Sequence, residues 1–241
     1  MKTKTILILS GGMDSTVLLY HLLSIGHEVR ALGINYGQRH VRELECAAEI
    51  CKEVGVEFRV ADLTALKPLM GGSSQTDDSV PVPEGHYEEA SMKKTVVPFR
   101  NGLMLSVAAA WAISTKSNHI AFAAHAGDHA VYPDCREEFA SAFNTTLLLG
   151  DWHQASLIRP FVTKTKADIV QIGQSLQVPF EKTHTCYAGT KVACGRCGTC
   201  CERISSFAHV GAVDPLQYKD GWKKSVDWAV NAEVDFRSKK N

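Results

Sequence analysis

The chain has 241 residues, which is enough for one sizeable hydrophobic core and a small appendage. Its 26 Lys and Arg residues balance 26 Asp and Glu residues, so no strong basic field can hold the phosphates of DNA or tRNA, and nucleic acid is not an expected partner. The sequence has no run of about 18 apolar residues, which argues against a membrane-spanning helix.

The N-terminus and the cysteines indicate a compartment. The first residues lead directly into an apolar segment and form no signal peptide, so we expect a cytoplasmic protein. In a reducing compartment, the 8 cysteines favour a metal site over disulfides.

The first predicted strand is followed by a glycine-containing turn and a helix. Residues 6–9 are all apolar, which is typical of a buried strand, and the pattern from residue 14 onwards predicts a helix. Such a turn aims unpaired backbone N–H groups and the positive end of the helix dipole at one point, where a phosphate binds well. An ordinary strand–helix connection is the alternative, but two serine hydroxyls add donors here. The candidate phosphate ligands at this turn are Ser10, Gly11, Gly12 and Ser15.

Strands and helices alternate along most of the remaining chain. Further strands are predicted over residues 28–36, 56–62 and 119–125. The intervening helices are predicted over residues 41–53, 102–114, 136–148 and 166–176. This alternation predicts an α/β fold with an open, mostly parallel sheet that binds ligands at the carboxyl ends of its strands.

Residues 63–95 interrupt the alternation. The segment is polar, rich in Gly, Ser and Pro, and has no sustained period. A connection of this length is either functional or disordered, and we expect a lid over the site because it lies between two functional-looking stretches.

Four closely spaced cysteines predict a metal site in the C-terminal part of the chain. Cys186, Cys194, Cys197 and Cys200 have the spacing Cys-x7-Cys-x2-Cys-x2-Cys, which suits one tetrahedral zinc ion. An iron–sulfur cluster is the competing interpretation, and zinc is favoured because nothing else suggests redox chemistry. A site with four cysteines has no open position, so we expect it to stabilise the fold. Cys201 is either a bystander or a substitute ligand.

The glycine-containing turn also has a recognisable sequence. The chain contains neither Gly-x-x-x-x-Gly-Lys-[Ser/Thr] nor Gly-x-Gly-x-x-Gly. Its Ser-Gly-Gly-x-Asp-Ser segment resembles the pyrophosphate loop (PP-loop) of the ATP pyrophosphatases. Those enzymes split ATP into AMP and pyrophosphate and use the AMP to activate a substrate oxygen.

Together, the PP-loop and the four cysteines resemble the 7-cyano-7-deazaguanine (preQ0) synthase family. The resemblance covers nearly the whole chain and is carried by the stretches "LSGGMDST", "INYGQRH", "VPVPEGHYEEASMKKTVVPFRNG", "HAGDHAVYPDCREEF", "TKADIV" and "CGRCGTCCER". Residues 125–127 and 130–136 depart from the form that many members of the family carry.

The resemblance implies a Rossmann-like fold of the adenine nucleotide alpha hydrolase type. Residues 1–180 would form the PP-loop domain, and residues 181–241 a small helical zinc-binding module. ATP with Mg²⁺ would adenylate the carboxylate of 7-carboxy-7-deazaguanine, ammonia would give the amide, and a second ATP would lead to the nitrile. A homodimer is expected on the same basis.

Site residues follow from the resemblance and from side-chain chemistry. The expected catalytic residues are Lys166, Arg100 and Asp14. The expected ATP-binding residues are Ser10, Gly11, Gly12, Asp14, Ser15, Arg39 and Lys166. The expected substrate-binding residues are Arg100, Asn101, His125, Tyr132, Asp134 and Arg136.

Plainer roles remain open for several of these residues. Asp14 and Asn101 are each placed to cap a helix, a role that for Asp14 is compatible with orienting Mg²⁺. Tyr132 is about as often a core residue as a stacking one. For Lys166 and Arg39, the alternative interpretation is a solvated surface residue.

Other functions are possible for the same motifs. The chain is too short for a glutaminase domain, so ammonia would come from solution or from a partner. Related antiphage-defence enzymes attach the activated deazaguanine to the N-terminus of a partner protein, which is the close alternative. A zinc-ribbon binding module is disfavoured by the intact PP-loop and the balanced charge.

Overall fold

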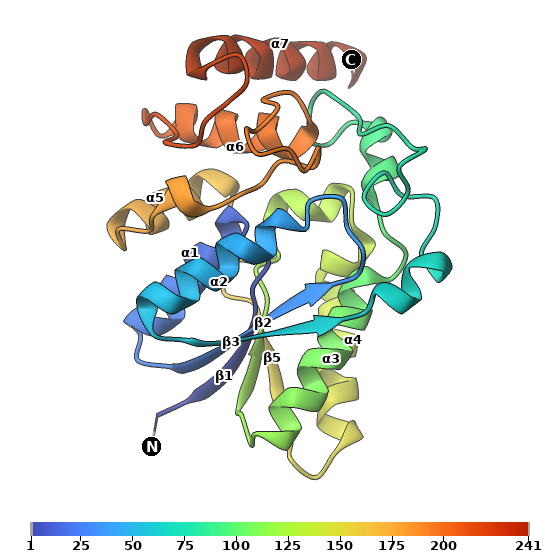
Figure 1. Cartoon of the computed structure of the whole chain (residues 1–241), viewed down its shortest axis with the longest axis vertical. Helices are drawn as coiled ribbons and strands as arrows, with labels where there is room; N and C mark the ends of the chain where they lie inside the picture. Colours follow the sequence, from blue (N-terminus) through green and yellow to red (C-terminus); the bar gives the residue numbers. More distant parts are fainter. Residues whose placement is uncertain (1, 241) are drawn as a thin grey trace.

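A parallel five-stranded sheet forms the centre of the computed structural model, which describes residues 2–240 (Figure 1). The strand order is β3-β2-β1-β4-β5. The strands are β1 (Lys4–Ile8), β2 (Glu28–Asn35), β3 (Glu57–Asp62), β4 (His119–Ala121) and β5 (Ser156–Ile158). In register, Ile6 of β1 lies between Arg30 of β2 and Ile120 of β4. The predicted α/β class and parallel sheet are confirmed.

Helices cover both faces of the sheet. The α-helices are α1 (Met13–Ser24), α2 (Arg42–Val54), α3 (Arg100–Ser114), α4 (Glu137–Gly150), α5 (Lys166–Ser175), α6 (Gly198–His209) and α7 (Trp222–Lys240). The 3₁₀ turns are η1 (Thr64–Leu69), η2 (Ala90–Thr95), η3 (Ala126–Ala130), η4 (Pro133–Cys135) and η5 (Phe180–Lys182). None of the helices within residues 2–240 is long and apolar enough to cross a membrane.

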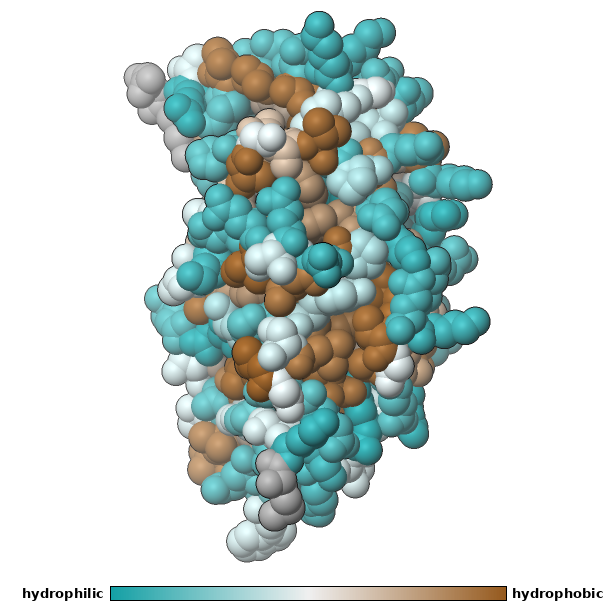
Figure 2. All heavy atoms as spheres, turned by 90° about the vertical axis from the view of Figure 1, so that its left-hand side faces the viewer, coloured by the Kyte–Doolittle hydropathy of each residue, from teal (hydrophilic) through white to brown (hydrophobic). Residues whose placement is uncertain are grey.

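Alternating residues of the first strand pack into two separate hydrophobic cores. Ile6 and Ile8 point into the core shared with α3 and α4, whereas Leu7 and Leu9 point into the core shared with α1 and α5. The helices of the two cores lie on opposite sides of the sheet (Figure 1). Seen from the side of α1, α2 and α5, the surface carries brown apolar areas near its middle between teal hydrophilic ones (Figure 2).

Two elements differ from the sequence predictions. The strand predicted over residues 119–125 ends at Ala121, and extended chain leads on to His125. The edge strand β5 was not predicted, because three residues are too few for a periodic signal.

The C-terminal helices form a layer beyond the carboxyl ends of the strands (Figure 1). The segment of residues 63–95 reaches this layer. Glu84 pairs with Cys197, and the Gly85 N–H donates to the Arg196 carbonyl at 3.0 Å. The His86 ring stacks on Phe236 of α7 with 4.1 Å between centroids. This segment, called the insert below, is therefore packed between the sheet and the cysteine-containing region.

Candidate active site

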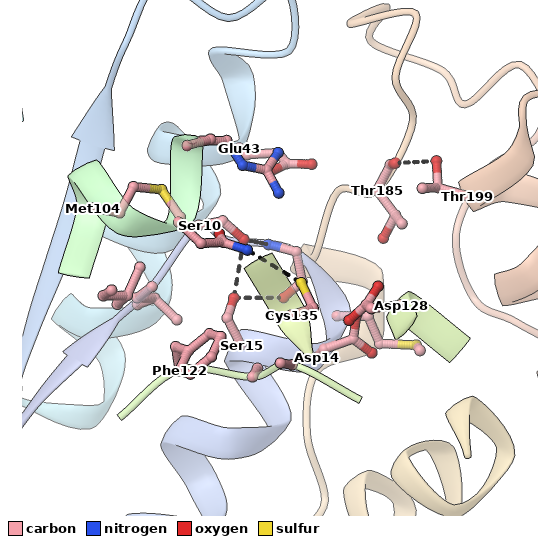
Figure 3. A pocket seen from close by; sticks show the side chains of 18 of the residues that line it. Ser10, Asp14, Ser15, Glu43, Met104, Phe122, Asp128, Cys135, Thr185 and Thr199 are labelled. Atoms are coloured by element: carbon pink, nitrogen blue, oxygen red, sulfur yellow. Dashed lines mark hydrogen bonds between the residues drawn. The ribbon is translucent and has the colours of Figure 1, made fainter. Parts of the chain in front are cut away.

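A cavity of about 200 Å³ opens where β1, β2 and β4 end (Figure 3). Its apolar floor includes Ile8, Ile34 and Phe122, each at or just beyond the end of a strand. The site lies beside β1, where the chain order of the strands reverses between β1 and β4. Open parallel sheets bind ligands at this position, because neighbouring loops leave in opposite directions there.

The turn after β1 is held in a shape that only glycine permits. Gly11 has a φ of 89°, and a Cβ on it would lie 1.9 Å from the Glu43 carbonyl oxygen. The Gly12 N–H donates to Ser10 Oγ at 3.1 Å, and Ser10 Oγ lies 3.1 Å from Ser15 Oγ. Gly12, and not Asp14, occupies the N-cap of α1, and no side chain caps that helix. Its first N–H groups are therefore available to an anion.

Lys166 places a buried ammonium group opposite this turn. It is the first residue of α5, which is held by a reciprocal capping box between Thr165 and Asp168. The Lys166 Nζ lies 2.7 Å from Asp14 Oδ2 and 3.1 Å from Glu202 Oε2. Burial alone would lower the pKa of Lys166, but these carboxylates raise it, so the ammonium form is retained.

His125 and Asp128 lie behind this ammonium. His125 Nδ1 accepts a hydrogen bond from the Gly127 N–H at 3.1 Å, and its Nε2 lies 3.5 Å from Asp128 Oδ1. Asp128 also accepts a hydrogen bond from the Tyr87 hydroxyl at 2.9 Å. Burial raises the pKa of Asp128, but the nearby His125 and Lys166 outweigh it and keep that pKa below its usual range.

A second cation, half-buried, lies at another part of the cavity. Arg100 begins α3, and its Nη1 lies 3.5 Å from the Tyr36 hydroxyl. Its guanidinium carbon is 5.9 Å from the centre of the Tyr132 ring. The Tyr132 hydroxyl is hydrogen-bonded to Thr95 at 2.7 Å and to Tyr187 at 2.9 Å, which fixes the hydroxyl end of the ring. This wall can hold a flat ligand that carries a negative charge.

The structure brings together many of the residues predicted for the site. The cavity is lined by Ser10, Gly12, Asp14, Ser15, Arg100, Asn101, Tyr132 and Lys166. Gly11 shapes the turn from behind, and His125 contacts Lys166 Nζ at 3.3 Å without lining the cavity.

Three other predicted residues do not line the cavity. Asp134 Oδ2 accepts a hydrogen bond from the Asn101 N–H at 2.9 Å and so caps the start of α3. The exposed Arg136 donates to the His129 carbonyl at 2.9 Å. Arg39 Nη2 donates to the Asp77 carbonyl at 3.1 Å and thereby ties down the insert.

Several residues of the site were missed by the sequence predictions. Tyr36, Asp128 and Glu202 lie inside the motif stretches "INYGQRH", "HAGDH" and "CGRCGTCCER", which was the available signal. Glu43 gave no signal, since an acidic residue on an amphipathic helix is usually solvated. In the fold its carboxyl is buried across the cavity from Asp14 (Figure 3), and burial raises its pKa well above the usual range despite the opposing charge of Arg100.

The four predicted metal ligands converge. The sulfur atoms of Cys186, Cys194, Cys197 and Cys200 all lie within 4.8 Å of one another. Cys194 Sγ and Cys200 Sγ are 3.9 Å apart, close to the roughly 3.8 Å between ligands on a tetrahedral zinc with bonds of about 2.3 Å. The N–H of Cys197 donates to Cys194 Sγ at 3.3 Å, which favours a thiolate. Cys201 lies outside the cluster and donates to the Arg196 carbonyl.

Known proteins are similar in sequence to this chain over most of its length. The family model described as queuosine biosynthesis protein QueC matches residues 4–211. A 7-cyano-7-deazaguanine synthase of Pseudoalteromonas translucida is 44% identical over 219 residues, which cover 91% of this chain and 100% of that protein. The enzyme of the same name from Methanoregula boonei is 47% identical over 216 residues, which cover 90% of this chain and 99% of that protein.

Proposed function

The chain belongs to the family of the queuosine biosynthesis protein QueC, and from this membership we propose that it makes 7-cyano-7-deazaguanine (preQ0) from 7-carboxy-7-deazaguanine and ammonia. It is an ATP-dependent synthase of the carbon–nitrogen ligase class. In the proposed reaction, the carboxylate oxygen attacks the α-phosphorus of ATP, and pyrophosphate leaves. Ammonia then displaces AMP to give the amide. A second adenylation, on the amide oxygen, lets that oxygen leave as AMP while the nitrile forms.

The PP-loop side of the cavity supports the ATP-binding role. The uncapped N-terminus of α1, the hydroxyls of Ser10 and Ser15, and the Lys166 ammonium would meet the charge that develops on pyrophosphate. The apolar floor at Ile8 and Phe122 would receive the adenine ring.

The opposite side of the cavity supports binding of the deazaguanine. Arg100 would pair with the carboxylate and leave one oxygen facing the α-phosphorus. The Tyr132 ring, fixed through its hydroxyl, would stack on the base. The observation that carries the proposal is that a half-buried arginine beside aromatic rings and an uncapped PP-loop share a single cavity.

Two metal ions have suitable residues. The cysteine cluster fits Zn²⁺, and its closed ligand set would supply folding stability. Asp14 Oδ1 is buried without a hydrogen-bond partner beside the PP-loop, which suits a ligand of the Mg²⁺ that accompanies ATP. Such an ion would neutralise phosphate charge.

We also propose that residues 63–95 act as a lid. Tyr87 of this segment lines the cavity, and its hydroxyl is bonded to Asp128. Release of that bond would open one wall of the cavity for substrate entry.

Mass spectrometry of the reaction products tests the proposed function. Purified protein is incubated with ATP, Mg²⁺, 7-carboxy-7-deazaguanine and ammonia, and we expect the nitrile together with AMP and pyrophosphate. Arg100→Gln should lower turnover by roughly 100-fold or more, whereas the exposed control Arg59→Gln should not. If the amide accumulates, or if no free base product forms, nitrile synthesis is refuted and a protein acceptor becomes the next substrate to test.

A further inference from the structure

Helix α6 connects the cysteine cluster to the ATP side of the cavity. It begins at Gly198, directly after Cys197, and carries Cys200 in its first turn. The Thr199 hydroxyl donates to the Thr185 carbonyl at 2.9 Å (Figure 3). One turn further, the fully buried Arg203 donates to Asp214 Oδ2 at 2.6 Å. The start of this helix is therefore fixed on several sides.

Glu202 projects from this fixed part of α6 into the site. Its side chain is 13% exposed, and its Oε2 lies 3.1 Å from Lys166 Nζ. A Cβ on Gly127 would come within 2.7 Å of Glu202 Oε1, so the glycine leaves the space that this carboxylate occupies. Glu202 Oε2 has no hydrogen-bond partner among residues 2–240, and Lys166 forms an ion pair with it.

The neighbouring His125 cannot replace Glu202 as an acceptor for Lys166. Because Nδ1 of His125 accepts a hydrogen bond from the Gly127 N–H, the proton of the neutral ring is assigned to Nε2. That N–H faces the carboxylates of Asp128 and Glu202, at 3.5 and 3.8 Å. Within residues 2–240, the Lys166 ammonium then donates a hydrogen bond to Asp14 at 2.7 Å and forms an ion pair with Glu202 at 3.1 Å.

These two carboxylates have different positions relative to ATP. Asp14 belongs to the PP-loop helix, where Mg²⁺ would compete with Lys166 for the Asp14 oxygens and phosphate would compete with Asp14 for the Lys166 ammonium. Glu202 approaches from α6, outside the loop. We propose that Glu202 is a positioning residue that keeps Lys166 aimed at the phosphates, and that the metal-bound cysteine cluster fixes Glu202 through α6. The catalytic part of this inference rests on the proposed function, whereas the coupling itself does not.

Chemical labelling of lysines tests the coupling without turnover. The protein is treated briefly with an amine-reactive acetylating reagent, and the modified lysines are quantified by mass spectrometry. Glu202→Gln keeps the size of the side chain but removes its charge, and Ser205→Ala changes the exposed face of the same helix as a control. We expect labelling of Lys166 to rise several-fold in Glu202→Gln, with the other lysines and the zinc content unchanged. Glu202→Asp should give an intermediate rate.

Kinetics and chelation complete the test. In the preQ0 assay, Glu202→Gln should lower kcat by about 10- to 100-fold with little change in the KM for the deazaguanine, as supporting residues around a site commonly do. Removal of zinc by a chelator should raise labelling of Lys166 in the parent protein. Unchanged Lys166 labelling in Glu202→Gln would overturn the inference, and so would an increase spread over all lysines. A parent protein that makes no preQ0 would refute the proposed function and leave the labelling result valid.

Discussion

Arg203 is the largest fully buried side chain in residues 2–240, and its charge is fully matched. Asp214 accepts two hydrogen bonds from its guanidinium, at 2.6 and 2.9 Å, and Thr183 and Thr185 accept two more. A buried ion pair of this kind is a weak source of net stability, but loss of one partner leaves an unpaired charge in the core.

Substitution of Arg203 should therefore destabilise the protein. We expect Arg203→Met to lower the free energy of unfolding by about 3–5 kcal/mol, because Asp214 would remain buried without its cation. The exposed Arg59→Met should change it by about 1 kcal/mol or less. Urea unfolding of both variants measures the difference, and equal midpoints would contradict this account.

His40 makes stability depend on pH. Burial, then the charges of Arg100 and His184, lowers the pKa of His40 to about 3. In the unfolded chain this ring takes up a proton near pH 6.5, whereas the folded protein resists protonation, so stability falls as the pH drops from about 6.5 towards 3. Through this group, a change from pH 7.5 to pH 5 should lower the free energy of unfolding by about 2 kcal/mol.

Urea unfolding at the two pH values checks this prediction. The decrease in the free energy of unfolding between pH 7.5 and pH 5 should be smaller in His40→Gln and unchanged in the exposed control His209→Gln. A parent and a His40→Gln variant with the same pH dependence would show that this ring is not the responsible group.

At the scale of elements, the C-terminal region is built on the cysteine cluster and closed by α7. The cluster lies where α6 begins, and α7 packs along α6. Arg196, within the cluster segment, lies over the Trp228 ring of α7 at 4.9 Å. Helix α7 continues from Trp222 to Lys240.

Loss of one cysteine ligand should destabilise this region. Cys200→Ser should reduce bound zinc to well below one ion per chain and lower Tm by at least about 10 °C, because metal binding and folding of such sites are coupled. Cys46→Ser on α2, outside the cluster, should retain both zinc and Tm. Zinc analysis and thermal unfolding of the two variants measure these differences.

Helix α7 should also restrain the insert. The His86 ring stacks on Phe236, and its Nε2 lies 2.5 Å from Glu233 Oε2. Phe236→Ala should speed amide exchange of residues 84–89 by about 2- to 10-fold, since an aromatic pair contributes roughly 0.5–1.5 kcal/mol. The exposed Val234→Ala is the matched control. Identical exchange in both variants would refute a restraining role for this contact.

At the scale of the whole molecule, the cavity joins distant parts of the chain. Lys166 and Asp14 meet across 152 positions of sequence, and Tyr187 and Thr199 of the C-terminal region line the same cavity as Ile8. Ligand binding should therefore stabilise the chain as a whole.

Formation of a homodimer stays a prediction.

Thermal unfolding with a non-hydrolysable ATP analogue and Mg²⁺ measures this stabilisation. At 100 times its Kd, a ligand contributes about 2.7 kcal/mol, which corresponds to a rise in Tm of roughly 5–10 °C for a chain of this size. Lys166→Gln should abolish most of the shift, whereas the exposed Lys223→Gln should preserve it. A Tm that does not respond to the nucleotide would contradict ATP binding in this cavity.

The sequence by itself determined the features that depend on neighbouring residues. A strand, a glycine turn and a helix follow one another within the first 24 residues, and their geometry is set by local backbone preferences. Three of the four cysteines fall within seven positions, so their convergence needed little from the rest of the fold. The alternation of strands and helices indicated the parallel sheet for the same reason.

Only the tertiary structure decided which polar groups are free to bind a ligand. Asp134 and Glu43 are both acidic residues in or next to the first turn of a helix, yet packing makes Asp134 a backbone cap and buries Glu43 in the cavity. The partners of Lys166 come from α1 and α6, which are far apart in sequence, and no local sequence pattern predicts these contacts. Burial and long-range contacts select the role of a charged side chain, because its energy depends on the groups that surround it in space.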